Sequence, residues 1–237
     1  MAVSVVFTDR AGGASGPPFD TLNLATHVGD DPADVAVNWT TLASRANVPA
    51  ERLVVLAAVS GGPVGQVGVD SPAEVTGVEA VVSAESDLAV GVIAADCVPV
   101  LLADESAGVV AAAHAGRRGV QARIVTDTVL AMRELGADPA ATVAWLGPAI
   151  CGRCYEVGED VAAQTLAVAP AAQARTSWGT TALDLPAAVL SELGQLGVGE
   201  VHANPRCTYE DPTLFSYRRD GRTGRQASVV MRTSVAG

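Results

Sequence analysis

The chain has 237 residues, of which 49% are hydrophobic and 17% charged, and its formal net charge is −11. This composition is typical of an ordered globular protein and argues against long disordered tails. The acidic balance disfavours general binding to nucleic acid or to anionic membranes, because both need a basic surface. A small-molecule substrate stays compatible with it, since a local arginine cluster outweighs a distant net charge.

The segment MAVSVVFTDR lacks the basic and long apolar regions of a signal peptide. No apolar run approaches the roughly 20 residues that a membrane span needs. We therefore expect a cytoplasmic protein whose four cysteines, at positions 97, 151, 154 and 207, are reduced. No break in composition divides the chain, which predicts a single domain over residues 1–237.

The apolar pattern predicts strands and helices in a mixed order. A strand at 3–8 is followed by a helix at 32–46, capped by Asp30 or Asp31, and by strands at 53–59, 65–69, 79–83, 88–95, 98–102 and 109–113. Next come a helix at 119–135 that stops at Gly136, a strand at 142–146, helices at 159–167 and 185–196, and strands at 200–203 and 227–232. Strands and helices without strict βαβ alternation indicate an α/β fold with a mixed sheet and helices packed against it.

Residues 94–119, AADCVPVLLADESAGVVAAAHAGRRG, carry the pattern most informative about chemistry. Apolar runs flank the turn-forming residues 104–107, which predicts an antiparallel hairpin with a four-residue loop. In that register Ala103 pairs with Gly108, and Cys97 lies directly opposite His114. A neighbouring thiol and imidazole suit a cysteine nucleophile with its base, or two ligands of a soft metal.

The alternative is that both residues belong to the core, because a cysteine beside an apolar strand is usually a small buried hydrophobe. The geometric argument also depends on the register, since a shift of one residue would move one side chain to the other face.

Two basic segments are candidate anion sites. Arg117 and Arg118, in the HAGRRG motif, stand at the start of the predicted helix, where glycines permit a close backbone approach and arginines form a phosphate or carboxylate clamp. The segment YRRDGRTGR at 217–225 is denser and contains Arg218 and Arg219. A solvated surface loop is the alternative interpretation of both.

The other cysteines and histidines are interpreted as structural. Cys151-Gly-Arg-Cys154 invites a zinc or redox interpretation, but neither a second CxxC nor a paired His accompanies it. Cys207, His27 and His202 are assigned to packing, although His27 lies in a polar loop that could border a cleft.

Several ordered motifs together resemble the YfiH-type laccase-domain family, also described as multicopper polyphenol-oxidase-like. They are TDRAGGASGPPFDTLNLATHVGDD, ADCVPVLLAD, HAGRRG, GPAICGRCYEVG and CTYEDPTLFSYRRDGRTGRQA. The resemblance covers nearly the whole chain and implies a three-layer mixed-sheet α/β fold like that of the YfiH-like cysteine hydrolases. It also implies a zinc or copper site of one Cys and two His, two of which match Cys97 and His114. Activities attached to the family include phosphorolysis of purine nucleosides, adenosine deamination, polyphenol oxidation and hydrolytic editing of peptidoglycan precursors.

The chain departs from the family at the implied metal site. The family's other His sits in a Gln-Val-His-Gly motif, which matches Ala58-Val59-Ser60-Gly61 here, so Ser60 replaces the third ligand. Arg117 stands in place of the Trp of the family's HAGWRG motif, and Trp39 stands in place of the family's Arg after Asn38. Asn38 itself is a candidate substrate contact. A serine hydroxyl is a poor ligand for zinc or copper. A weakened metal site is therefore expected.

We expect an enzyme that acts on a purine nucleoside, by phosphorolysis or deamination of adenosine or inosine, through Cys97 and His114. With a metal, the pair would hold an ion that polarises substrate or activates water. Without one, Cys97 would be a nucleophile with His114 as its base, and Ser60 favours this version.

Two alternatives stay open. The same Cys/His pair would support an amidase that edits a cell-wall precursor, and the lost ligand would suit a binding or regulatory protein with a degraded metal site. An oxidase is disfavoured, because three histidines and one aligned cysteine cannot furnish a multicopper cluster. The expected partners are small molecules, either a nucleoside with phosphate or a cell-wall precursor.

Overall fold

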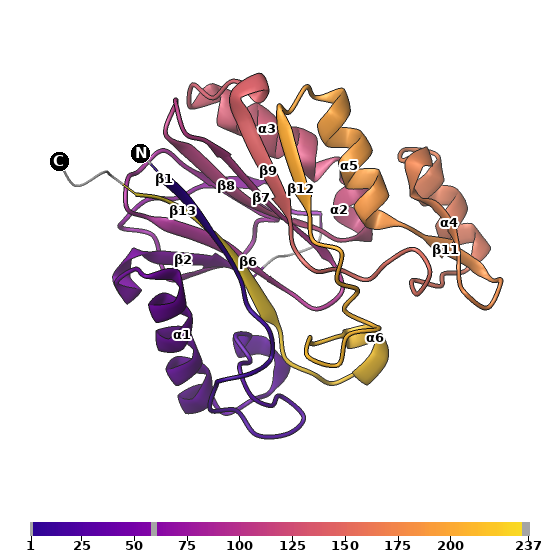
Figure 1. Cartoon of the computed structure of the whole chain (residues 1–237), viewed down its shortest axis with the longest axis horizontal. Helices are drawn as coiled ribbons and strands as arrows, with labels where there is room; N and C mark the ends of the chain where they lie inside the picture. The colour runs from indigo at the N-terminus through magenta and orange to yellow at the C-terminus, as the bar shows by residue number, and fades with distance from the viewer. Residues whose placement is uncertain (1, 58–60, 234–237) are drawn as a thin grey trace.

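The structure is a computed structural model that describes residues 2–57 and 61–233. Two mixed β-sheets pack face to face, and helices cover their outer faces (Figure 1). The mixed α/β class predicted from the sequence is confirmed. Because the strands divide between two sheets, the described residues stack as helix, sheet, sheet and helix, where the resemblance implied three layers.

The first sheet has the strand order β1-β13-β6-β2-β4. Strand β13 is antiparallel to both of its neighbours, whereas β2 and β4 continue parallel to β6. Helix α1 packs on the outer face through Leu42, Ala43 and Ala46, and the Asp31 side chain caps its first turn. The bounds are Ala2–Phe7 for β1, Leu53–Leu56 for β2, Glu74–Val75 for β4, Ala89–Ala94 for β6, Gln226–Thr233 for β13 and Pro32–Ala46 for α1.

The second sheet has the order β12-β9-β7-β8-β5-β3, and helices α2, α3 and α5 cover its outer face. Strands β7 and β8 lie at its centre, and their continuous apolar sequence reflects burial on both faces. The strand bounds are Val64–Gln66 for β3, Ala80–Ser83 for β5, Val98–Asp104 for β7, Val109–Ala115 for β8, Thr142–Leu146 for β9 and Glu200–Ala203 for β12. The helix bounds are Arg117–Ala122 for α2, Ile124–Glu134 for α3 and Leu185–Gln195 for α5.

The remaining elements are short. Strands β10 (Gln173–Arg175) and β11 (Thr181–Leu183) form a separate antiparallel pair beside helix α4 (Glu159–Leu166), and α6 (Tyr217–Asp220) lies in the basic segment. Across residues 2–57 and 61–233, no helix has the length and apolarity needed to cross a bilayer.

One predicted helix is divided in two. The apolar pattern predicts a single helix over 119–135, but α2 ends at Ala122 and α3 begins at Ile124. Arg123 between them adopts a left-handed conformation with φ of 61° and donates its backbone N–H to the Val120 carbonyl. The break does not interrupt the buried face, since Val120 and Ile124 both join the same core.

Candidate active site

Cys97 and His114 come together where the two sheets meet. Cys97 lies directly before β7, at the point where the chain passes from β6 of the first sheet to the second sheet, and His114 lies near the end of β8. The β7–β8 hairpin pairs His114 with Pro99 rather than with Cys97, so the predicted register is wrong by two residues. Because side chains alternate with a period of two, this shift leaves Cys97 and His114 on one face as diagonal neighbours.

The register differs because the loop occupies residues 105–108 instead of 104–107. Strand β7 runs through Asp104, one residue beyond the last predicted pair at Ala103, and the Asp104 carboxylate accepts hydrogen bonds from the backbone N–H groups of Ser106 and Ala107. Gly108, with φ of 72°, takes the left-handed position that closes the turn.

Gly116 marks the contact between the thiol and the imidazole. A Cβ atom added at this glycine would lie 3.0 Å from Cys97 Sγ and 3.1 Å from His114 Cε1. The two side chains therefore flank the same point of the backbone, and any larger residue at Gly116 would displace one of them.

Glu79, which the sequence analysis did not single out, adds a carboxylate to this pair. Its side chain is fully buried, with one oxygen 3.4 Å from His114 Nδ1 and the other accepting a hydrogen bond from the Gly61 N–H. A buried carboxylate beside a histidine fixes the orientation of the ring and stabilises the imidazolium. The available sequence signal was an acidic residue at the head of an apolar strand, because a fully buried glutamate nearly always has a partner.

The electrostatics favour a charged imidazole. Burial lowers the pKa of His114, but the charge of Cys97, its hydrogen bond to the ring and the Glu79 carboxylate outweigh burial and raise the pKa to about 10. The His114 imidazolium can therefore deliver a proton beside the sulfur of Cys97.

A cavity of about 220 Å³ opens on the Cys97–His114 pair and is also lined by His27, Tyr217 and Arg225. A second hollow of about 360 Å³ shares these three residues and adds Arg222. The two hollows therefore adjoin, which gives a cleft with the Cys97–His114 pair in one half and a further arginine in the other. Of the basic segment at 217–225, Arg225 is thus the arginine that lies beside the pair.

Tyr155 is a second residue that the sequence analysis missed, although it belongs to the quoted motif GPAICGRCYEVG. The Arg218 guanidinium lies over its ring, 4.8 Å from the centroid. Burial and the charge of Cys97 raise the pKa of Tyr155, while the charges of Arg218 and Arg117 and a hydrogen bond from Arg117 oppose this. The phenol of Tyr155 therefore lies near the Cys97 thiol and near Arg117 and Arg218, two of the predicted anion-binding arginines. Arg118 is exposed on α2 and lines neither hollow.

Asn38 is a correction to the predicted substrate contacts, because its side chain is fully buried. All hydrogen-bonding groups of its side-chain amide are satisfied by the loop before α1. The amide donates to Ser15 Oγ and to the carbonyls of Thr21 and Asn23, and its oxygen accepts from the Ala14 N–H. Asn38 therefore holds this loop on α1 and cannot reach a ligand.

The structure also corrects the prediction that Arg219 binds an anion. Its guanidinium donates to backbone carbonyls of residues 208, 209, 211 and 214 and to the Asp220 carboxylate. These acceptors satisfy all of its N–H groups. Arg219 therefore shapes the loop over 208–220 instead of binding an anion.

Asp96 ties this loop to the turn that carries Cys97. One carboxylate oxygen accepts from Thr208 Oγ1 at 2.6 Å and from Ser216 Oγ at 2.7 Å, and the other accepts from the Arg218 backbone N–H at 2.6 Å. Asp96 itself is buried and has a φ of 97°. The shape of the cleft therefore depends on a carboxylate next to the candidate nucleophile.

Replacing Asp96 with alanine is expected to lower the free energy of unfolding by about 2–4 kcal/mol, because two buried hydroxyl donors and one partly buried N–H lose a charged acceptor. Urea unfolding at pH 7, followed by circular dichroism, measures this. Asp70→Ala is the matched control, since Asp70 is exposed in a turn and should change stability by no more than about 0.5 kcal/mol. A loss below about 1 kcal/mol for Asp96→Ala would contradict the anchoring role.

The implied zinc or copper ion does not fit the donors that the described residues supply at this pair. Ser60 lies outside the described residues. Within 2–57 and 61–233, Cys97 and His114 belong to no group of three or more Cys, His, Asp and Glu ligand atoms close enough to share one ion, although Glu79 lies 3.4 Å from His114 Nδ1. A catalytic zinc site ordinarily has three protein ligands and a water.

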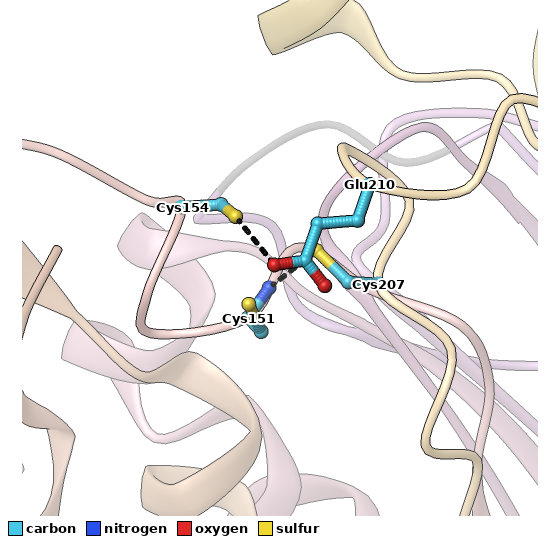
Figure 2. A group of neighbouring side chains, drawn as sticks. All are labelled: Cys151, Cys154, Cys207 and Glu210. Atoms are coloured by element: carbon cyan, nitrogen blue, oxygen red, sulfur yellow. Dashed lines mark hydrogen bonds between the residues drawn. The ribbon is translucent and has the colours of Figure 1, made fainter. Parts of the chain in front are cut away.

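A different cluster gathers the other three cysteines, which the sequence analysis treated as separate packing residues. The sulfurs of Cys151, Cys154 and Cys207 and a carboxylate oxygen of Glu210 all lie within 4.8 Å of one another (Figure 2). Cys154 Sγ donates to the carboxylate at 3.4 Å, and the Cys151 N–H donates to Cys207 Sγ at 3.3 Å. Burial raises the pKa values of the Cys154 and Cys207 thiols.

Fold and site together define an α/β protein of two packed mixed sheets, with a cysteine, a histidine and a buried glutamate at one end and arginines beside them. Residues 4–233 match the model of the multi-copper polyphenol oxidoreductase laccase family. The chain belongs to this family, as the motifs of the sequence predicted.

Named relatives are similar to this chain over nearly its full length. The chain is 52% identical to purine nucleoside phosphorylase SCO2081 of Streptomyces coelicolor, covering 94% of this chain and 93% of that protein. It is 38% identical to purine nucleoside phosphorylase YfiH of Escherichia coli, over 96% and 93%. The crystal structure of Neisseria meningitidis protein NMB0706 superposes with a TM-score of 0.87 at 34% identity, covering 98% of this chain and 95% of that one.

Proposed function

We propose that this protein is a purine nucleoside phosphorylase that works through Cys97 and His114. The relatives that carry this name support the proposal, and so does the cleft. The observation that carries it is Arg225, which lines the same cavity as the Cys97–His114 pair. Phosphorolysis needs an anion held next to the nucleoside, whereas deamination and hydrolysis need only water. Arg222, in the adjoining hollow, extends the positive charge along the cleft.

In this proposal phosphate bound by Arg225 faces the ribose, and the purine lies toward His114. A phosphate oxygen bonds to C1′ while the bond from C1′ to N9 breaks, and the electron pair passes into the purine ring. The His114 imidazolium gives its proton to the purine, so a neutral base leaves. Cys97 keeps His114 charged, and Glu79 holds the ring. The products are ribose 1-phosphate and the free purine.

The anomer of the product distinguishes this direct route from a covalent one. In the covalent route Cys97 Sγ attacks C1′ first, and phosphate then displaces the sulfur. One displacement inverts the configuration at C1′ and two retain it. A β-nucleoside should therefore yield α-ribose 1-phosphate by the direct route and the β anomer if Cys97 is the nucleophile. Proton NMR of the product makes this assignment.

The test of the function itself is turnover of adenosine, inosine and guanosine with and without phosphate, followed by chromatography of the bases. Release of base that requires phosphate and yields ribose 1-phosphate is the expected result. Conversion of adenosine to inosine with ammonia would instead reveal a deaminase, and release of base without phosphate would reveal a hydrolase. Either outcome would overturn the phosphorolysis proposal.

Arg225→Gln is expected to raise the KM for phosphate by about 10- to 100-fold, because a charge-assisted contact to the anion is lost. The KM for the nucleoside should change much less, and Arg225→Lys should restore part of the phosphate affinity. Steady-state kinetics at varied phosphate measures both constants.

The matched control for this prediction is Arg133→Gln, since Arg133 is exposed on α3, on the outer face of the second sheet. It should leave both KM values unchanged. Equal effects of Arg225→Gln on the two KM values would show that Arg225 shapes the cleft rather than binding phosphate.

A second candidate function is favoured by Glu79. A cysteine beside a histidine that contacts a buried carboxylate also suits amide hydrolysis. The sulfur of Cys97 would attack the carbonyl carbon, the His114 imidazolium would protonate the leaving amine, and water would then hydrolyse the thioester. The substrate class would be a peptide amide of a cell-wall precursor. Release of an amino acid from such a precursor without phosphate, by a protein inert toward nucleosides, would select this function.

A further inference from the structure

We propose that Cys151, Cys154, Cys207 and Glu210 form a structural zinc site, separate from the Cys97–His114 pair. Nothing in the proposed phosphorolysis uses these four residues. They come from two loops that lie 56 residues apart in sequence, measured from Cys151 to Cys207. The fold therefore brings together four side chains from distant segments, and the three cysteines among them also pack with Ile150 in a small cluster.

The donor set and its dimensions suit zinc. Thiolate sulfur and carboxylate oxygen are both zinc ligands, and a tetrahedral ion with Zn–S bonds of about 2.3 Å places neighbouring sulfurs about 3.8 Å apart. The four ligand atoms already lie within 4.8 Å of one another and converge on one point (Figure 2). A contraction of about 1 Å, within the reach of side-chain rotation, would complete the tetrahedron.

The spacing of the ligands is that of two chelating turns. Cys151 and Cys154 are separated by two residues, and so are Cys207 and Glu210. The second turn is thus the partner that the CxxC motif lacked, with a carboxylate in place of the fourth cysteine. Paired turns of this spacing are typical of structural zinc sites.

The backbone holds both turns in the shape that such a site needs. The Cys151 carbonyl accepts from the N–H groups of Cys154 and Tyr155, each at 3.0 Å, and the Cys207 carbonyl accepts from the Asp211 N–H at 2.9 Å. A β-bridge joins Ala149 to Cys207 and aligns the two loops. The N–H donated by Cys151 to Cys207 Sγ is a bond of the kind that orients and stabilises a metal thiolate.

All four positions would be filled by protein, which defines a closed structural site rather than a catalytic one. Cys154 and Cys207 are buried, so the centre is shielded from solvent. Glu210 also lies 3.4 Å from Arg153, but the two side chains are 45% and 71% exposed. An ion pair this exposed contributes little, so it does not account for the position of Glu210.

The site would act as a clamp beside the cleft. Tyr155, which lies under the Arg218 guanidinium, directly follows the ligand Cys154. Thr208, which donates to Asp96, directly follows the ligand Cys207. A bound ion would thereby fix the two loops that carry the Tyr155 and Asp96 contacts, and its removal should lower stability.

The test measures metal directly, on protein purified under reducing conditions and free of affinity-tag histidines. Zinc is quantified by mass spectrometry, and cobalt(II) replaces it as a spectroscopic probe, because thiolate ligands give a charge-transfer band in the near ultraviolet. The wild type and Cys97→Ser should each hold about one tight equivalent and show the band. Cys154→Ser and Cys207→Ser should lose both.

Glu210→Gln provides a test that does not depend on replacing a buried cysteine, since the Glu210 side chain is 45% exposed and its substitution should leave the protein folded. It should keep the band but weaken zinc binding by about tenfold or more, whereas Glu134→Gln, on the exposed face of α3, should not. Reduced Cys97→Ser protein without a thiolate–cobalt band would overturn the proposal. So would a disulfide among Cys151, Cys154 and Cys207 that persists under mild reductant.

Discussion

Alanine in place of Cys97 or of His114 is expected to lower kcat/KM for phosphorolysis by about 10³-fold or more, while the protein stays folded. The two side chains act together, because Cys97 and Glu79 raise the pKa of His114 against the effect of burial. Residues that act as one unit give non-additive losses, so the double variant should be little worse than either single one. Initial rates with inosine and phosphate, together with circular dichroism of each variant, provide the measurement.

His202→Ala is the control, since His202 lies on β12, is half exposed and stacks on Trp145 away from the cleft. Its activity should match that of the wild type. Mild losses for Cys97→Ala and His114→Ala that add up in the double variant would mark both as packing residues. That result would favour the core interpretation of the pair, and with it a binding or regulatory role for the protein.

The elements that the sequence predicts best are those fixed by local signals. Helix α1 and strands β9 and β12 have the predicted bounds, and α1 starts at the cap that Asp31 provides. The β7–β8 hairpin was predicted, but its register depends on whether Asp104 ends the strand or opens the loop. The apolar pattern is silent on this choice, because the carboxylate decides it by bonding to the backbone of the turn.

The candidate site shows the same limit. Cys97 and His114 are joined by one hairpin, so counting along the chain brings them together even in a register that is two residues off. Glu79 and Tyr155 reach the pair through packing between distant segments, which local patterns do not encode. Asn38 and Arg219 were predicted as ligand contacts, but both bind backbone carbonyls of the protein. The residue type alone does not distinguish a polar side chain that binds the backbone from one that faces a substrate.

Ser60→His is expected to raise the affinity of the Cys97–His114 pair for zinc by orders of magnitude. The resemblance implies that Ser60 takes the position of the family's third ligand, and a histidine there would complete the ordinary catalytic zinc set. The next residue, Gly61, donates its N–H to Glu79, and Glu79 is in contact with His114. The chain directly after Ser60 therefore lies beside the pair.

This measurement must be separated from zinc bound by the three other cysteines. Calorimetric titration under reducing conditions at neutral pH is therefore done in a Cys154→Ser/Cys207→Ser background, where only Cys151 and Glu210 remain of that four-residue cluster. The background protein should bind zinc weakly, and the addition of Ser60→His should produce one tight site that Cys97→Ser then removes. Tight binding by the background protein alone would mean that another residue already supplies the third ligand. The alignment of Ser60 to the ligand position, or the consequence drawn from it, would then be wrong.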